Sequence, residues 1–482
     1  MNFKEPLWTS AELTATCGGA GAQPWYADGI QIDSREVLPG DLFVALPGTQ
    51  KNGHAYVAEA FSKGAVAAIV SEDVPGKDIP ALKLVHVPDT MQALRLMAAQ
   101  ARVRAPVKTI AVTGSAGKTS VVQALRQALE RTDATHASIK SFNNHVGVPL
   151  SLARMPRQAR FGVFEIGMSG PGEVRGGAML VKPDVAVVTA VGAAHAGRFG
   201  RIFEIAKAKS EIFEGLKPDG VAIFGVDHEW AGNLMDAVKA SGHERLTVSV
   251  TGEADVRPLR ITEHGNCTCL TADVAGTTIT YKIGQPGREW VLNSLLVLAA
   301  VKAVEGDLGH AALALAKLEA EPGRGRQHLL TLPHATVTLI DDSYNANPLS
   351  LKAALRRLSL TPTKKFGRRI AVLADMRELG ARSNELHMKL ADDLKRFGVD
   401  KVIAFGPQMN EVGKVAGIST ERWHKDDDSA LRLAETLRDG DAVIVKGANS
   451  AGLGDIVRGL LRVNAAERAE DANNKLGVSY AL

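Results

Sequence analysis

The chain has 482 residues, of which 45% are hydrophobic and 23% are charged, and its formal net charge is +4 at pH 7. This is the composition of a soluble globular protein with about three domains, since a domain has roughly 150 residues. The small charge, without any block of five basic residues, argues against nucleic acid as a partner, and no apolar run approaches the ~20 residues of a membrane span.

Residues 1–105 are expected to form a small α/β domain. The first residues lack a charged start followed by an apolar run, which predicts no signal peptide. The cysteines are odd in number, and Cys17 is far from Cys267 and Cys269, which favours a reducing compartment, so we expect a cytoplasmic protein. Apolar runs at 41–46 and 65–70 predict strands, and Pro106 is typical of a boundary.

A phosphate-binding loop is predicted at Thr113-Gly114-Ser115-Ala116-Gly117-Lys118-Thr119-Ser120. It follows an apolar strand at 109–112 and precedes a helix, so backbone N–H groups and the helix N-terminus would cradle phosphates. Lys118 would reach the β- and γ-phosphates and stay exposed in the empty loop, and Thr119 would ligate Mg²⁺. The loop differs from the common phosphate-binding motif GxxxxGK[ST], because Val112 occupies the position of the first glycine in that motif. The alternative is an ordinary glycine-rich turn.

The rest of the chain predicts two further α/β domains, with boundaries at 106–325 and 326–482. Strands and helices alternate in both, which is typical of parallel doubly wound sheets. Several apolar strands run into one charged or polar residue, and ligands bind beyond the carboxyl ends of parallel strands. Each residue alone could be a turn or cap residue, but together they favour a site: Glu165, His195, Asp341, Asp342, Asp375 and Lys446.

Lys209 is predicted to face the core. The segment 202–216 is helical by its pattern, and Lys209 shares the apolar stripe with Ile205 and Ile212, whereas Lys207 points to solvent. An inward lysine must extend its amine to the surface, pair with a carboxylate or be chemically modified.

At this point the chain resembles the Mur ligases over nearly its whole length. The phosphate loop, Phe164-Glu165-Ile166-Gly167, His195 and the lysine segment 206–213 are similar to that family's central domain. Residues 341–348, which read DDSYNANP, and Val445-Lys446-Gly447 resemble its C-terminal domain. Asp33-Ser34-Arg35 and the loop 141–150 are similar to its segments that bind the nucleotide-sugar substrate.

The resemblance implies three domains: an N-terminal uridine-nucleotide domain, a central ATP-binding domain and a C-terminal Rossmann-like domain. It implies a monomeric ATP- and Mg²⁺-dependent ligase of peptidoglycan precursor synthesis. This ligase would join D-alanyl-D-alanine to the terminal carboxylate of UDP-N-acetylmuramoyl-tripeptide through an acyl phosphate. The third residue of that tripeptide is not specified by the sequence.

The resemblance also assigns roles to residues. One Mg²⁺ would be held by Thr119 and Glu165, and a second by His195 and a carbamylated Lys209. The catalytic residues would be Lys118, Glu165, His195 and Lys209. Besides residues 113–120, ATP would contact Asn293, Arg324 and Asp342. The remaining substrate contacts would be Ser34, Arg35, Asn143, Asn144, Tyr344, Asn345 and Asn347.

One segment departs from the family pattern. Gly287-Arg288-Glu289-Trp290 stands where the family usually has a His-Asn pair near the adenine. Trp290 would either stack on the adenine or belong to the core. Two other functions stay open: a folylpolyglutamate synthase-like ligase, and a nucleotide-gated binding or regulatory protein whose catalysis has decayed.

Overall fold

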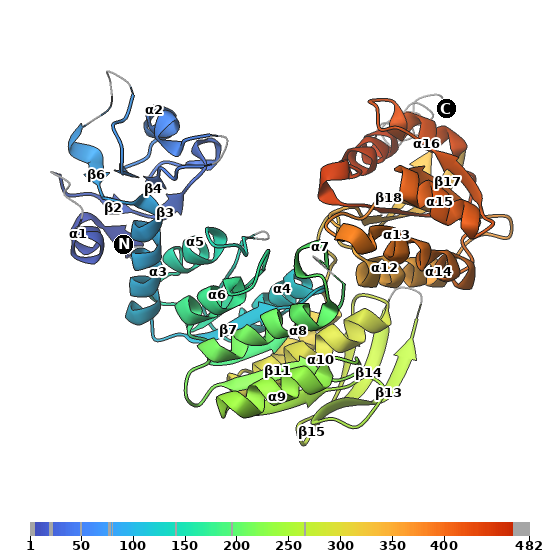
Figure 1. Cartoon of the computed structure of the whole chain (residues 1–482), viewed down its shortest axis with the longest axis horizontal. Coiled ribbons are helices and arrows are strands. Elements are labelled where there is room, and N and C mark those ends of the chain that lie inside the picture. Colours follow the sequence, from blue (N-terminus) through green and yellow to red (C-terminus); the bar gives the residue numbers. More distant parts are fainter. Residues whose placement is uncertain are drawn as a thin grey trace, which may run out of the picture.

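A computed structural model describes residues 5–18, 23–48, 51–75, 79, 81–139, 142–193, 196–264 and 267–465. His195 and the residues after 465 lie outside this range. The chain forms an N-terminal, a central and a C-terminal part, each with its own main sheet, and the central part lies between the other two (Figure 1). The predicted α/β class is confirmed. The boundaries at 105 and 325 stay a prediction.

The N-terminal part is built on a parallel sheet in the order β3-β4-β5-β6. The strands predicted at 41–46 and 65–70 are β4 and β5, and both are fully buried because they lie inside this sheet. The elements are β1 (Trp8–Thr9), α1 (Ser10–Cys17), β2 (Tyr26–Ala27), β3 (Gly29–Gln31), β4 (Asp41–Val44), α2 (Val57–Ser62), β5 (Ala67–Val70), β6 (Leu84–His86) and α3 (Thr90–Arg104).

Helix α3 joins the N-terminal part to the central one. Its Leu94 and Met97 share one apolar cluster with Leu42 of β4 and with Leu150 of the central helix α5 (Gly147–Ala153). The Trp8 indole also donates a 2.9 Å hydrogen bond to a carbonyl of α5. The loop before α5, which contains Asn143 and Asn144, is therefore held at this junction.

The central part contains a nine-stranded sheet in the order β15-β14-β13-β12-β11-β10-β7-β9-β8. Its strands are β7 (Lys108–Thr113), β8 (Thr135–Ala137), β9 (Phe161–Glu165), β10 (Val185–Val188), β11 (Val221–Gly225), β12 (Glu244–Val248), β13 (Val256–Glu263), β14 (Thr268–Val274) and β15 (Thr277–Ile283). Its helices are α4 (Lys118–Leu129), α5, α6 (Glu173–Val181), α7 (Ala196–Phe199), α8 (Ile202–Ser210), α9 (Ala231–Ser241), α10 (Arg288–Ala303) and α11 (Leu308–Ala316).

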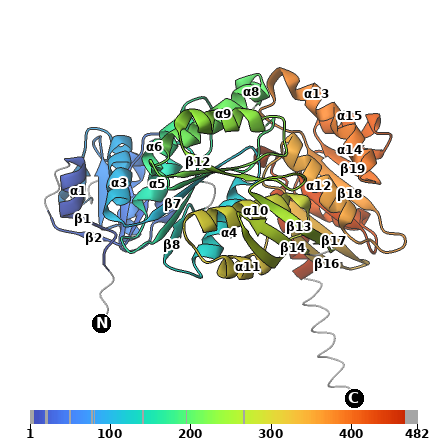
Figure 2. The same ribbon diagram turned by 90° about the horizontal axis from the view of Figure 1, so that it is seen from below.

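Helices cover both faces of this sheet. Alternate residues of β7 divide between two apolar clusters: Ile110 and Val112 pack with α4, α10 and α11, whereas Ala111 packs with α6, α8 and α9. This is the side-chain alternation of a strand that is buried on both faces. Figure 2 shows α8 and α9 on one side of the sheet, and α4, α10 and α11 on the other.

The end of the central sheet differs from the predicted parallel alternation. Strands β13, β14 and β15 pair antiparallel as two hairpins. Between β14 and β15 the chain turns at Ala275 and Gly276, and both have a positive φ. Two successive positive φ values match the tight turn whose twist suits a hairpin. This turn was not predicted, because Ala275 is not a typical residue for that conformation.

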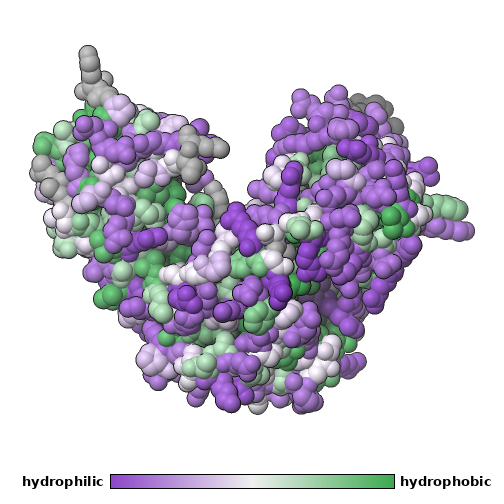
Figure 3. All heavy atoms as spheres, in the orientation of Figure 1, coloured by the Kyte–Doolittle hydropathy of each residue, from purple (hydrophilic) through white to green (hydrophobic). Residues whose placement is uncertain are grey.

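The C-terminal part has a six-stranded sheet in the order β16-β17-β21-β18-β19-β20, parallel except for the β16–β17 pair. Its elements are β16 (Arg326–Leu332), β17 (Ala335–Asp342), α12 (Pro348–Leu360), β18 (Arg369–Ala374), α13 (Ser383–Met388), α14 (Leu390–Arg396), β19 (Lys401–Phe405), α15 (Pro407–Val415), β20 (Ser419–Arg422), α16 (Ser429–Thr436) and β21 (Ala442–Lys446). The space-filling view shows a wide opening between the N- and C-terminal parts (Figure 3). No helix within the described residues is both long and apolar enough to cross a bilayer.

Candidate active site

The predicted phosphate loop lies between β7 and the N-terminus of α4. Gly114 and Gly117 have φ values of 153° and 84°. A Cβ on Gly114 would lie 1.9 Å from Thr189 Oγ1, so only glycine fits there. Ser115 is fixed from the neighbouring loop, because its Oγ donates to the Gly192 carbonyl over 3.0 Å. The strand, glycine turn and helix thus leave the first N–H groups of α4 directed to the loop.

Lys118 is folded back onto its own loop. Its Nζ donates a 2.9 Å hydrogen bond to the Gly114 carbonyl, and the residue is half-buried. The expectation of an exposed lysine is therefore wrong, because the turn at Gly114 presents a carbonyl within reach of the amine. Burial lowers the pKa of Lys118, and the Glu165 carboxylate opposes that shift.

Glu165 ends β9 and connects three segments of the central part. Its Oε2 accepts a 2.7 Å hydrogen bond from Thr119 Oγ1, and its Oε1 accepts a 2.6 Å hydrogen bond from Asn143 Nδ2. Strands β7 and β9 are paired so that Val112 is opposite Glu165, which brings the carboxylate beside the loop. Only 1% of Glu165 is exposed.

Lys209 faces the core of the central part, as the helical stripe predicted. It is 2% exposed on α8, whereas Lys207 is exposed. Within the described residues, the hydrogen-bond contact of its Nζ is the Met168 sulfur at 3.8 Å. Burial, with a further contribution from the Lys118 charge, holds the pKa of Lys209 well below its ordinary value.

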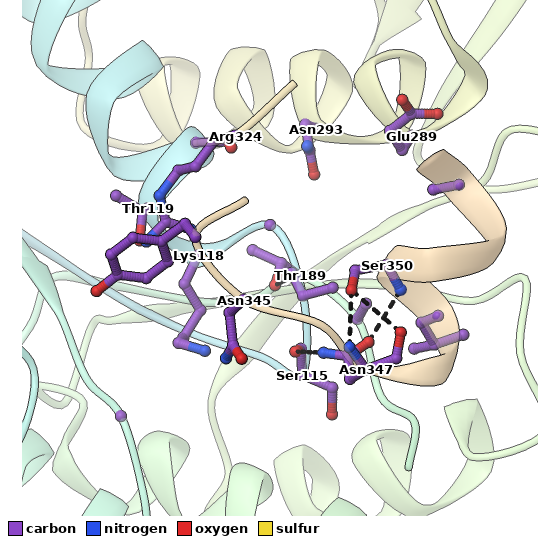
Figure 4. A pocket seen from close by; sticks show the side chains of 18 of the residues that line it. Ser115, Lys118, Thr119, Thr189, Glu289, Asn293, Arg324, Asn345, Asn347 and Ser350 are labelled. Atoms are coloured by element: carbon purple, nitrogen blue, oxygen red, sulfur yellow. Dashed lines mark hydrogen bonds between the residues drawn. The ribbon is translucent and has the colours of Figure 1, made fainter. Parts of the chain in front are cut away.

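The C-terminal part supplies a second group of polar residues beside the loop. Asn347 Nδ2 donates to the Ser115 carbonyl over 3.1 Å and its side chain also caps α12. Lys446, at the end of β21, forms a 2.8 Å ion pair with Asp342 and is 2% exposed. The Arg324 guanidinium lies 4.1 Å from the centre of the Tyr344 ring. Figure 4 shows Asn347 beside Ser115, and Arg324 near Thr119, with Asn293 and Glu289 on a helix at the edge of the same cavity.

This cavity has a volume of about 530 Å³ and lies between the central and C-terminal parts. Of the predicted residues, it is lined by Ser115, Ala116, Gly117, Lys118, Thr119, Ser120, Asn143, Asn144, Glu165, Lys209, Asn293, Arg324, Asp342, Tyr344, Asn345 and Asn347. Thr113 and Gly114, the first two residues of the predicted loop, do not line the cavity. The structure therefore brings most of the predicted site together.

A second cavity of about 430 Å³ adjoins the first on the side of the N-terminal part. The two cavities share Asn143, Asn144, Gly167 and Glu173. The second also contains Arg95 of α3 and Gly177 of α6. A ligand in it could therefore reach Glu165 and the phosphate loop with one end.

Two predicted residues lie elsewhere. The buried Ser34 donates a 2.7 Å hydrogen bond to Glu59, and the exposed Arg35 binds Asp33; both belong to the N-terminal part and line neither cavity. His195 is outside the described residues. Of the other strand-end residues, Asp375 accepts a 2.8 Å hydrogen bond from Met409 N at the start of α15, and Asp341 binds the turn at Gly323. These two are turn and cap residues.

Three residues of the cavity wall had no assigned role in the sequence, although Glu289 lies in the segment that departs from the family pattern near the adenine. Thr189 follows β10 directly and donates to the Ala116 carbonyl over 2.5 Å, so the strand-end signal applied to it as well. Glu289 and Arg357 form an ion pair of 2.7 Å between α10 and α12. Trp290 is 4% exposed within the central core, which leaves too little ring surface for stacking on a base.

The side chains present suit a hard cation at one position. A hydroxyl from Thr119 and a carboxylate from Glu165 are oxygen ligands of the kind that Mg²⁺ takes. An ammonium at Lys209 cannot be a ligand, whereas its carbamate would offer an oxygen there. Among the described residues, no three histidine, cysteine or acidic side chains gather as a metal site.

Comparisons with known proteins agree with this geometry. Residues 27–102 match the model "Mur ligase family, catalytic domain", residues 112–301 match "Mur ligase middle domain", and residues 325–449 match "Mur ligase, glutamate ligase domain". The UDP-N-acetylmuramoyl-tripeptide–D-alanyl-D-alanine ligase of Escherichia coli is 33% identical, over 90% of this chain and 93% of that protein. The Bacillus subtilis enzyme of the same name is 29% identical, over 92% and 96%.

Solved structures give the same result. A crystal structure of MurF from Acinetobacter baumannii is similar with a TM-score of 0.82 and 26% identity, over 94% of this chain and 99% of that one. The MurF ligase of Thermotoga maritima in complex with ADP is similar with a TM-score of 0.75 and 25% identity, over 91% and 98%.

Proposed function

The chain belongs to the Mur ligase family, and we propose that it is the member that adds D-alanyl-D-alanine to the peptide of the cell-wall precursor. It joins the amino group of D-alanyl-D-alanine to the terminal carboxylate of UDP-N-acetylmuramoyl-tripeptide, and ATP is converted to ADP and phosphate. The observation that carries this proposal is the pair of adjoining cavities, which share Asn143 and Asn144 beside the phosphate loop.

Amide formation from a carboxylate requires activation, because its oxygen is a poor leaving group. An oxygen of the tripeptide carboxylate attacks the γ-phosphorus of ATP, and the bond from that phosphorus to the β–γ bridging oxygen breaks, which gives an acyl phosphate and ADP. The amine of D-alanyl-D-alanine then attacks the acyl carbon to form a tetrahedral intermediate. The nitrogen loses a proton, the carbon–oxygen bond to phosphate breaks, and the amide remains.

Such chemistry depends mainly on positioning and on neutralising phosphate charge. The N–H groups of residues 116–119 hold the phosphates at the N-terminus of α4, while the Ser115 N–H donates to the Ala190 carbonyl. When ATP enters, Lys118 Nζ exchanges the Gly114 carbonyl for phosphate oxygens. Arg324 adds positive charge from the opposite wall of the cavity, where Tyr344 supports its guanidinium.

Mg²⁺ would offset phosphate charge and align the reacting oxygens. Thr119 and Glu165 would hold one ion, and Lys209, as a carbamate, would hold a second together with His195. The support for the first position is the hydroxyl–carboxylate pair, and the support for the second is a deeply buried lysine without a carboxylate partner among the described residues.

The tripeptide would lie in the second cavity with its carboxylate at the junction, against Asn143 and Asn144. Ser34 and Arg35 would contact the uridine nucleotide, so they need not line either cavity. Asp342, Tyr344, Asn345 and Asn347 would hold ATP and the incoming dipeptide from the C-terminal side. The enzyme would act as a cytoplasmic monomer.

The competing functions find less support. An E. coli FolC structure shares only the fold, with a TM-score of 0.56 and 19% identity. A decayed regulatory protein would gain nothing from keeping Glu165 and Lys209 buried, since each is costly without a ligand.

The test is phosphate release from ATP with UDP-N-acetylmuramoyl-tripeptide, with and without D-alanyl-D-alanine. Release should require both substrates; equal release without them would reject the ligase.

A further inference from the structure

The nucleotide cavity extends along α10, from the phosphate loop toward the N-terminus of this helix. The Asn293 side chain lies over the phosphate loop, because a Cβ on Gly117 would be 3.0 Å from Asn293 Oδ1. Glu289 lies one turn earlier on the same helix face, about 6 Å further along the axis at 1.5 Å per residue. Both residues line the cavity (Figure 4). A nucleotide with its phosphates at Gly117 therefore extends its base toward Glu289.

The end of the cavity at Glu289 has the shape and polarity of a base slot. Its walls are Leu292 of α10 and Leu349, Ala353 and Ala354 of α12. These apolar side chains suit the faces of a flat ring. The charged groups at this end are Glu289 and Arg357, which form an ion pair of 2.7 Å between the two helices.

Two glycines leave room for the side chains of this ion pair. A Cβ on Gly325 (φ 89°) would lie 1.7 Å from Arg357 Nη1, and a Cβ on Gly287 (φ 115°) would lie 2.5 and 2.6 Å from the two Glu289 oxygens. Arg357 Nη1 also donates to the Gly325 carbonyl over 2.9 Å. Both positions have a positive φ, which favours glycine, and each glycine leaves the space that one charged group of the pair occupies.

The carboxylate is the member of the pair that is available to a ligand. The Arg357 side chain is 8% exposed and its two terminal nitrogens bind Gly325 and Glu289, whereas the Glu289 side chain is 28% exposed. Glu289 Oε1 accepts from Arg357, and none of the described residues donates to Oε2. A carboxylate oxygen accepts hydrogen bonds and cannot donate them.

We propose that Glu289, held by Arg357, selects adenine by accepting a hydrogen bond from the 6-amino group of the base. This inference rests on the proposed use of ATP. A base with a 6-oxo group would place an oxygen against the carboxylate and lose the hydrogen bond, so it would be rejected. Arg357 is a positioning residue, because it acts on the base only through Glu289.

The test is calorimetric binding of ADP and of inosine diphosphate to the full chain with Mg²⁺. The two differ at the 6-position and the adjoining ring proton. A hydrogen bond to a charged group corresponds to roughly 10- to 100-fold in affinity, so the wild type should prefer ADP by about that factor. In Glu289→Gln the amide can turn its N–H₂ to a 6-oxo group, so the preference should fall to about threefold or less.

The control is a second ion pair between the same two parts of the chain. Arg356, the neighbour of Arg357 on α12, lies 3.5 Å from Glu263, and neither residue lines the cavity. Glu263→Gln should therefore keep the full preference for ADP. Equal affinities in the wild type, or an equal loss for both nucleotides in Glu289→Gln, would overturn the inference. Phosphate release without both substrates would reject the ligase and leave a measured ADP preference standing.

Discussion

Thr119 Oγ1 donates a 2.7 Å hydrogen bond to Glu165 Oε2, which ties the first turn of α4 to the end of β9. The contact follows from the sheet, because β7 leads into the loop and β9 is its parallel neighbour. A hydroxyl and a carboxylate at the carboxyl ends of adjacent strands form the start of a cation site, and the other carboxylate oxygen is fixed by Asn143. We expect this pair to be the most sensitive to substitution.

Glu165→Gln should lower kcat by about 100-fold or more while the protein stays folded, because it removes the anionic ligand of the proposed Mg²⁺ position beside the phosphates. Phosphate release as a function of Mg²⁺ concentration checks this, and the variant should need more Mg²⁺ for half-maximal rate. Glu204→Gln, at an exposed position on α8, is the control. An unchanged Mg²⁺ requirement in Glu165→Gln would contradict the assignment.

Lys118→Ala should abolish turnover and leave the melting temperature nearly unchanged. The amine is bonded to a loop carbonyl and does not belong to an apolar cluster, so its removal leaves no core cavity. Thermal unfolding and phosphate release are measured together, with Lys108→Ala as an exposed control on the preceding strand. A loss of several kcal/mol of stability would show that Lys118 is structural.

Arg35→Ala should raise the KM for the UDP-muramoyl substrate and leave the KM for ATP nearly unchanged. The Arg35 side chain is 80% exposed and its partner is the neighbouring Asp33, so the substitution does not disturb the core. Steady-state kinetics with each substrate varied in turn checks this, and Arg396→Ala, exposed in the C-terminal part, should alter neither KM. A rise for ATP alone would refute the assignment.

Local patterns predicted the parts of the site that follow from local structure. The helical stripe placed Lys209 inward, and the strand ends identified Glu165 and Asp342, because each of these patterns depends on a single helix or strand. The folded-back Lys118 and the pair of Glu289 with Arg357 were not predictable in this way. Each depends on where the chain turns at a glycine, Gly114 or Gly325, and on segments that only the tertiary fold brings together.

His136 should make the fold sensitive to acid. It is packed beside Phe164, its Nε2 lies 2.7 Å from the Ser151 carbonyl, and burial lowers its pKa to about 4. The unfolded chain binds the proton from about pH 6.5, so stability falls as the pH drops from there toward 4. Urea unfolding at pH 7 and pH 5 should differ by about 1–2 kcal/mol from this group.

The matched variants separate this histidine from the other titrating groups. His136→Gln should be less stable at pH 7 but should lose about 1–2 kcal/mol less between pH 7 and pH 5 than the wild type. His310→Gln, at an exposed position on α11, should show the wild-type pH dependence. An identical pH dependence in all three proteins would show that His136 is not the responsible group.

Lys209→Ala should be nearly inactive, and acetate or another short carboxylic acid in the buffer should restore part of the activity. The lysine is 2% exposed, lines the nucleotide cavity and has a methionine sulfur as its hydrogen-bond contact within the described residues. A bare ammonium gains little there, whereas its carbamate, formed when the amine adds to CO₂ and loses a proton, carries oxygens that suit Mg²⁺. A small carboxylate can occupy the space that alanine leaves and supply such an oxygen.

Lys207→Ala, two residues away on the exposed face of the same helix, should keep wild-type activity and show no response to acetate. Full activity of Lys209→Ala would reject any catalytic role, and an inactive variant that acetate does not rescue would reject the carbamate.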